Sequence, residues 1–232
     1  MTEAGAGAPV LVRVAKSPAD WQAVRSLCCR TGNGGDPIDP ARWPLFAELW
    51  IGPYQRLLPK WTYVAEADGC VAGYLTGCPD TAAFRRARRF RITLPLLVAI
   101  ACGRYPWNAD ARRTVRLAFR LDRGLESRLA PAQPAGLART YPAHLHMNVE
   151  AEYRRRGVGA ALIERCARDL AAAGVPGIHL LCGAGPRPFY ARNGFTDLAA
   201  VETSPGRFVY TLGRRLCGGG RQVGDALTAA GA

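Results

Sequence analysis

The spacing of apolar and polar residues along the chain predicts strands and helices in alternation. Runs with the alternation of strands lie at residues 10–14, 61–66, 70–76, 144–150, 178–182, 195–198 and 208–212. Runs with helical spacing lie at residues 17–29, 39–50, 157–173 and 187–193. Ser17 and Asp20 offer a capping box for the first helix, and Asp68-Gly69 suits the tight turn of a hairpin. The pattern therefore predicts a sheet with helices packed against it.

The segment 80–139 interrupts this alternation. Its arginines are Arg85, Arg86, Arg88, Arg89, Arg91, Arg104, Arg112, Arg113, Arg116, Arg120, Arg123, Arg128 and Arg139. Apolar residues at helical spacing in 111–129 predict that part of the segment docks on the core. We therefore expect a helical insertion, and we favour a solvated arginine face over a nucleic-acid surface.

Length and composition indicate one domain. The chain has 232 residues, of which 49% are hydrophobic, which is enough for one sizeable core. We expect a single domain over 8–212, including the insertion, and a disordered glycine-rich tail over 213–232. No apolar run reaches the roughly 18 residues of a membrane span, and the first ten residues do not resemble a secretory signal. A cytoplasmic protein without a membrane partner is the expectation.

Net charge and cysteine content say less about function than the patterns above. The formal net charge is +13, but only Lys16 and Lys60 are lysines, so the excess of arginine is as typical of a coding bias as of a binding surface. The eight cysteines include no C-x-x-C pair, and several lie in apolar segments. We expect them to be buried, reduced thiols.

The segment 148–163 carries the candidate chemistry. A strand ends, a turn rich in arginine and glycine follows, and an amphipathic helix begins. Gly157 and Gly159 remove side chains where an anion could approach the main chain, and the first N–H groups of a helix have no partner within it. The turn matches neither the dinucleotide fingerprint nor the P-loop. It predicts a phosphate site of another kind.

Two motifs in this region resemble those of one enzyme family. The pattern Arg154-x-x-Gly157-x-Gly159 resembles the pyrophosphate loop of GNAT acetyltransferases, and residues 187–195 resemble the helix and strand that follow it in that family. Shorter strings at 52–54, 64–66, 73–81 and 141–146 are similar to bacterial relatives of the C-terminal acetyltransferase-like domain of O-GlcNAcase. The segment 183–186 departs from the family pattern because it lacks an asparagine often found there.

The resemblance implies an α/β (α+β) fold of the GNAT type. Its central mixed, twisted sheet has six to seven strands flanked by helices, and the arginine-rich helical insertion lies between strands 3 and 4. Two central strands splay apart, and the pantetheine arm of acetyl-CoA lies between them. The positions that the resemblance assigns to the coenzyme are Met147, Val149, Arg154, Arg155, Arg156, Gly157, Val158, Gly159, Ala160, Arg187, Phe189 and Tyr190.

The implied reaction is direct transfer of the acetyl group from acetyl-CoA, the co-substrate, to a primary amine. Tyr190 matches the family's tyrosine that protonates the departing thiolate, although it could also be a packed tyrosine whose hydroxyl bonds the backbone. Candidates for the base are Asp80 and Glu150, which could instead be a helix cap and a solvated turn carboxylate. Asn148 could orient the substrate or satisfy a local backbone group. Direct transfer leaves Cys182 no role as an acyl carrier.

Other functions follow from the same residues. A catalytically silent acetyl-CoA-binding module could use the arginine-rich insertion to bind an anionic partner. His144, His146 and His179 lie on neighbouring strands, but the family requires no metal and we expect none. The amine acceptor, in a small molecule or a protein, is not specified by the sequence. We do not expect nucleic acid as a partner, and the chain is expected to be a monomer or homodimer.

Overall fold

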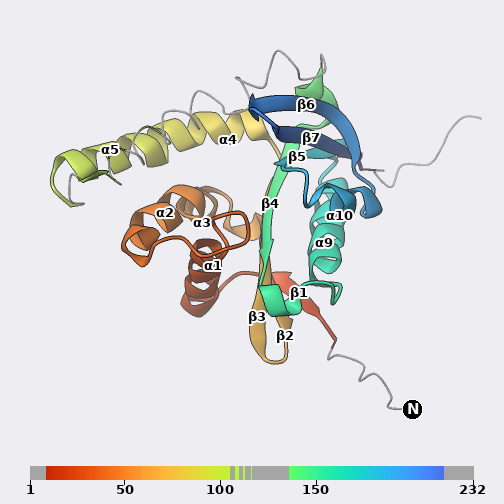
Figure 1. The fold of residues 1–232 in the computed structure, drawn as a ribbon, viewed down its shortest axis with the longest axis horizontal. Helices are drawn as coiled ribbons and strands as arrows, with labels where there is room; N and C mark the ends of the chain where they lie inside the picture. The colour runs from red at the N-terminus through yellow and green to blue at the C-terminus, as the bar shows by residue number, and fades with distance from the viewer. Residues whose placement is uncertain (1–8, 105–107, 110–111, 113–115, 117–135, 217–232) are drawn as a thin grey trace, which may run out of the picture.

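A mixed sheet of seven strands forms the centre of the molecule (Figure 1). The computed structural model describes residues 9–104, 108–109, 112, 116 and 136–216. The strands are β1 (Leu11–Val14), β2 (Thr62–Ala67), β3 (Cys70–Cys78), β4 (Ala143–Val149), β5 (Gly177–Cys182), β6 (Thr196–Ser204) and β7 (Arg207–Arg215), in the spatial order β1-β2-β3-β4-β5-β7-β6. Only β4 and β5 are parallel neighbours. The predicted fold class is confirmed.

Helices cover both faces of this sheet (Figure 1). On one face lie α1 (Pro18–Arg30), α2 (Trp43–Trp50) and α3 (Gly52–Leu57), and on the other lie α9 (Val158–Ala172) and α10 (Arg187–Arg192). Between β3 and β4, an arm made of α4 (Thr81–Arg88), the π-helical η3 (Arg89–Thr93) and α5 (Leu94–Ala101) extends away from the sheet, and α8 (Leu137–Thr140) precedes β4. Short 3₁₀ turns are η1 (Pro40–Arg42), η2 (Pro59–Trp61) and η5 (Ala151–Tyr153). The described part of the predicted insertion is therefore helical.

Local chemistry explains two of these elements. Asp20 N–H donates to the Ser17 hydroxyl over 3.1 Å, and Ser17 N–H donates back to the Asp20 carboxylate over 2.9 Å, which is the predicted capping box of α1. Asp68 and Gly69 have φ angles of 52° and 76°, so they form the predicted hairpin turn between β2 and β3.

Close packing holds α9 on the sheet. Leu162, Ile163 and Leu170 of α9 are fully buried in the larger core cluster, together with residues of β2 to β5. A Cβ atom at Gly77 of β3 would lie 2.9 Å from the Sγ atom of Cys166, so the absence of a side chain there lets the helix approach. A smaller cluster lies beneath α1 on the opposite face.

Several expectations need correction or lie outside the described residues. β7 continues to Arg215 and Leu216 is buried, so the tail cannot begin at residue 213; the remaining tail, 217–232, lies outside the described residues. So does almost all of the helix expected at 111–129. The described cysteines are free thiols, but Cys70 and Cys102 are exposed rather than buried. No helix within the described ranges is long and apolar enough to cross a membrane.

Candidate functional site

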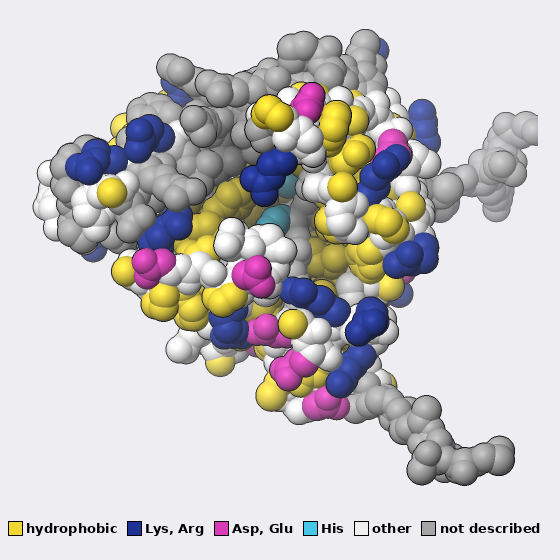
Figure 2. Space-filling model, in the orientation of Figure 1, with side chains coloured by type: hydrophobic (Ala, Val, Ile, Leu, Met, Phe, Trp, Pro, Cys, Tyr) yellow, Lys and Arg dark blue, Asp and Glu magenta, His cyan; other side chains and the backbone are white. Residues whose placement is uncertain are grey.

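The central opening of the sheet lies between β4 and β5. These strands pair only at Ala143–Ile178 and His144–His179, so they diverge toward their carboxyl ends. Glu150 N–H donates to Ala72 O on β3, and because donors alternate along a strand, the amides of Met147 and Val149 point toward the opening. Figure 2 shows a hollow in this view of the surface, in which histidine side chains are visible. The predicted splay is present.

The turn after β4 presents main-chain donors. Arg155 and Gly157 have φ angles of 64° and 82°, and the first amide of α9 bonded within the helix is that of Ala161, which donates to Gly157 O over 3.0 Å. The amides of residues 158–160 make no hydrogen bond to the described residues, and the first turn of α9 contains no acidic residue. Such a helix N-terminus attracts an anion.

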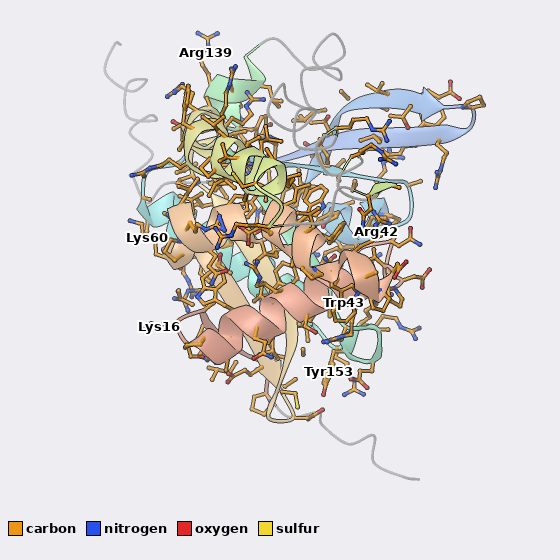
Figure 3. All side chains as sticks on the ribbon, turned by 90° about the vertical axis from the view of Figure 1, so that its left-hand side faces the viewer. Lys16, Arg42, Trp43, Lys60, Arg139 and Tyr153 are labelled. Carbon is orange, nitrogen blue, oxygen red and sulfur yellow. The ribbon has the colours of Figure 1, made fainter. Side chains whose placement is uncertain are left out.

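The three arginines of this turn have different surroundings. Arg154 donates to Val149 O over 3.2 Å and to Gly35 O over 3.3 Å, which joins the turn to the loop after α1. Arg156 pairs with Asp68 in the β2–β3 turn and stacks on Tyr153, the residue labelled beside that hairpin in Figure 3. Arg155 is exposed and makes no ion pair with the described residues. Its charge is the one that remains available to a ligand.

Tyr190 lies on α10 and is buried between two aromatic rings, those of Phe189 at 5.2 Å and Phe195 at 5.7 Å between centroids. Burial, and secondly the neighbouring Cys182, raises its pKa, so the hydroxyl keeps its proton at neutral pH. Within the described part of the chain, this hydroxyl has no hydrogen-bond partner. The expected alternative, a hydroxyl bonded to backbone, is therefore not observed there.

Gly159, Arg187 and Cys182, on the same side of the sheet as Tyr190, have different surroundings. A Cβ atom at Gly159 would lie 2.9 Å from the ring of Phe189, so the turn and α10 are in direct contact. Arg187, by contrast, donates to Asp197 over 2.8 Å, and this hydrogen bond is the main cause that raises the pKa of the arginine. Burial raises the pKa of the Cys182 thiol to about 11, so it is not a thiolate at neutral pH.

Both candidate carboxylates for the base are bound by other groups. Asp80 accepts a hydrogen bond from Ala83 N–H over 2.9 Å and caps α4. Glu150 accepts a hydrogen bond from Arg30 Nε of α1 over 2.8 Å. The structure therefore places the two residues as a helix cap and an ion-pair partner.

The face of β4 toward α1 to α3 is polar. His144 bonds the Tyr54 hydroxyl through Nε2 and the Thr81 hydroxyl through Nδ1, each over 2.8 Å. His179 donates from Nδ1 to Tyr141 O over 2.7 Å. Among the described residues, no group of three histidine, cysteine, aspartate or glutamate side chains could hold a metal ion.

Sequence reasoning missed Tyr74 of β3, which organises this face. Its hydroxyl accepts a hydrogen bond from the Asn148 amide over 3.0 Å and lies 3.4 Å from Nδ1 of His146. Trp50 of α2 stacks on His146 with 5.9 Å between ring centroids. The string around residue 74 indicated a family resemblance, but no pattern along the chain indicated that these residues meet.

Comparisons with known proteins agree with this geometry. A family model described as an acetyltransferase (GNAT) domain matches residues 129–197. The crystal structure of SsHAT is 32% identical, with a TM-score of 0.69 over 90% of this chain and 98% of that one. A putative GNAT acetyltransferase from Desulfovibrio desulfuricans (16% identity, 90% and 100% covered, TM-score 0.53) and an N-acetyltransferase from Staphylococcus aureus Mu50 (13%, 90% and 99%, 0.52) share the fold. The chain belongs to the GNAT acetyltransferases.

Proposed function

We propose that this acetyltransferase moves the acetyl group of acetyl-CoA directly to a primary amine of a small molecule or a protein. The observation that carries the proposal is the turn between β4 and α9, where three consecutive main-chain amides lack protein partners beside an exposed arginine. A diphosphate needs such donors and finds no competing carboxylate in this turn of the helix.

The described residues fit the coenzyme along its length. The main-chain donors of residues 157–160 would hold the diphosphate, with Arg155 adding charge. Amides of Met147 and Val149 face the opening and would pair with the pantetheine arm, and the amide of Val149 would face the thioester oxygen. Phe189 contacts this region, whereas Arg154, Arg156 and Arg187 would act through the loops and strands to which they are bonded.

Tyr190 is proposed as the acid that protonates the departing thiolate. Its hydroxyl keeps a proton, because burial raises its pKa, and has no competing partner among the described residues. Asn148 is proposed to orient the acceptor. Glu150 and Asp80, the candidate bases, would have to leave Arg30 and the α4 cap to accept a proton.

The test is release of free thiol from acetyl-CoA across a panel of amines, peptides and amino sugars. Replacing Tyr190 with phenylalanine should lower kcat by about 100-fold, a typical contribution of a general acid, while calorimetry shows unchanged affinity for acetyl-CoA. Folded protein that takes up no acetyl-CoA would contradict the proposal at its base. Protein that binds acetyl-CoA but acetylates no acceptor would support the silent module described next.

A second candidate is a catalytically silent acetyl-CoA-binding module whose arm binds an anionic partner. Residues 81–104 contain six arginines and no acidic residue. Phe90, Leu94 and Val98, four residues apart, are exposed by 67%, 55% and 53% on this arm. Binding through these arginines should weaken steeply as salt is added. A common origin with the O-GlcNAcase-like domains, action in the cytoplasm, and a monomeric or dimeric state are further proposals that rest on the sequence alone.

A further inference from the structure

On the polar face of β4, the imidazole of His146 has no role in the proposed function. Glu150 is bound to Arg30, and Asp80 caps α4, so neither carboxylate faces an acceptor without first losing a partner. His144 is bonded through both ring nitrogens. His146, two residues further along the same face, has only its Nδ1 atom near a polar group.

The surroundings of His146 are aromatic and uncharged. Trp50 of α2 stacks on the ring at an interplanar angle of 24°. The ring of Tyr74 on β3 lies 6.0 Å from the His146 ring between centroids, at an angle of 46°. Behind Tyr74 lies the thiol of Cys28 from α1. The imidazole is half-buried, and its Nε2 atom has no hydrogen-bond partner in the described part of the molecule.

The Tyr74 hydroxyl is the polar neighbour of the Nδ1 atom of His146. Burial is the main cause that raises the pKa of Tyr74 well above 10, so its hydroxyl stays protonated. That hydroxyl accepts a hydrogen bond from the Asn148 amide, and the Cys28 thiol is its neighbour. The role proposed below requires the tautomer with hydrogen on Nδ1, which donates to the Tyr74 oxygen 3.4 Å away and leaves a lone pair on Nε2.

We propose that Nε2 of His146 is the base that accepts the proton of the acceptor nitrogen; this inference rests on the proposed acetyl transfer. The amine attacks the thioester carbon, a C–N bond forms, and the carbonyl electron pair moves to oxygen. His146 removes a proton from the cationic nitrogen of this adduct. The C–S bond then breaks, the carbonyl re-forms, and the thiolate takes the Tyr190 proton. Solvent returns the proton of His146 to Tyr190, so the products are the amide and free coenzyme A.

Burial also affects the protonation state of this base. It lowers the pKa of His146 to about 4, while it raises that of Cys28 to about 12, so both groups are neutral between pH 6 and 9. Such a weak base is poorly matched to a free alkylammonium but suits the adduct, whose nitrogen is more acidic because oxygen and sulfur are bonded to the neighbouring carbon. The acceptor must therefore arrive as a free amine.

The experiment compares four variants of the whole chain. His146→Gln should lower kcat by about 100-fold or more and leave the Kd for acetyl-CoA unchanged, because glutamine can hydrogen-bond but cannot take the proton. Glu150→Gln and Asp80→Asn, which remove the two candidate carboxylate bases, should each lower kcat less than His146→Gln does. His146→Ala should regain activity when imidazole is added, which a purely structural role would not produce. Across acceptors, the pH at which kcat/KM rises should follow the pKa of the amine.

The outcomes separate this inference from the proposed function. An active parent protein whose His146→Gln variant keeps its kcat overturns the inference alone, as does a larger loss in Glu150→Gln. Nitrogen NMR that finds the hydrogen of His146 on Nε2 at pH 7 overturns it as well. A parent protein that binds acetyl-CoA but acetylates no amine overturns the proposed function and this inference together.

Discussion

The turn between β4 and α9 and the polar face of β4 adjoin each other along the chain, yet they are built in opposite ways. The turn supplies its donors from consecutive main-chain amides. The polar face combines side chains of α1, α2, β3 and β4, centred on Tyr74 and His146. In the proposed function, coenzyme recognition would thus be local and rely on backbone, whereas acceptor chemistry would depend on side chains brought together by the fold. Changes in one region should therefore leave the other intact.

The largest effect is expected in the turn. Gly159→Val would add a side chain whose Cβ atom would lie 2.9 Å from Phe189 and 3.4 Å from Met147. We expect the Kd for acetyl-CoA to rise by at least about 100-fold, or about 2.7 kcal/mol, in calorimetry. Ala172→Val, an exposed position near the other end of α9, is the control and should bind normally. Normal binding by Gly159→Val would show that this turn does not hold the coenzyme.

A smaller effect is expected on the polar face. Tyr74→Phe leaves the Asn148 amide without its acceptor, so kcat should fall by about tenfold and the free energy of unfolding by about 1–2 kcal/mol. The matched control is Tyr63→Phe, because the Tyr63 hydroxyl donates to Asp169 of α9 over 3.1 Å. That control should lose about 1 kcal/mol of stability and keep its kcat. Equal losses of kcat in both variants would show that the polar face of β4 has no special part in the chemistry.

The smallest effect concerns α1, which contributes Cys28 and Arg30 to the polar face. The Arg13 hydrogen bond is the first cause that lowers the pKa of Asp20, whose carboxylate also closes the capping box. Because the folded-state pKa is depressed, this stabilisation is present above the unfolded pKa of about 3.9 and is lost progressively as pH falls from there through the folded-state pKa. Asp20→Asn should lower the free energy of unfolding by about 1 kcal/mol at pH 7 in urea titrations.

The same variant should differ less from the parent protein at pH 3 than at pH 7, because Asp20 of the unfolded parent is largely protonated at pH 3, which favours unfolding. Its affinity for acetyl-CoA should not change, since the coenzyme turn lies elsewhere. A difference in stability that stays constant between these two pH values would show that the charge of Asp20 contributes nothing.

Much of the fold could be predicted because the sequence signals for its turns and helix caps lie within a few residues of each other. The hairpin turn at Asp68-Gly69 and the cap at Ser17 depend on residues within three positions of each other. The end of β7 was predicted wrongly, because Gly213 and Arg214 have no strand pattern of their own. They are held in the sheet by pairing with β5 and by an ion pair of Arg214 with Glu164.

The candidate site also has features that could be predicted from the sequence and features that could not. The sequence by itself predicted a mixed sheet of six to seven strands, through a family resemblance carried by two short motifs. It also indicated the candidate phosphate turn and the candidate acid Tyr190, because each lies in a motif confined to a few residues. Only the tertiary structure decided that Glu150 meets Arg30 and that Tyr74 lies between Asn148 and His146. These contacts join residues separated by up to 120 positions, and which side chains meet over such a separation is set by packing rather than by local preference.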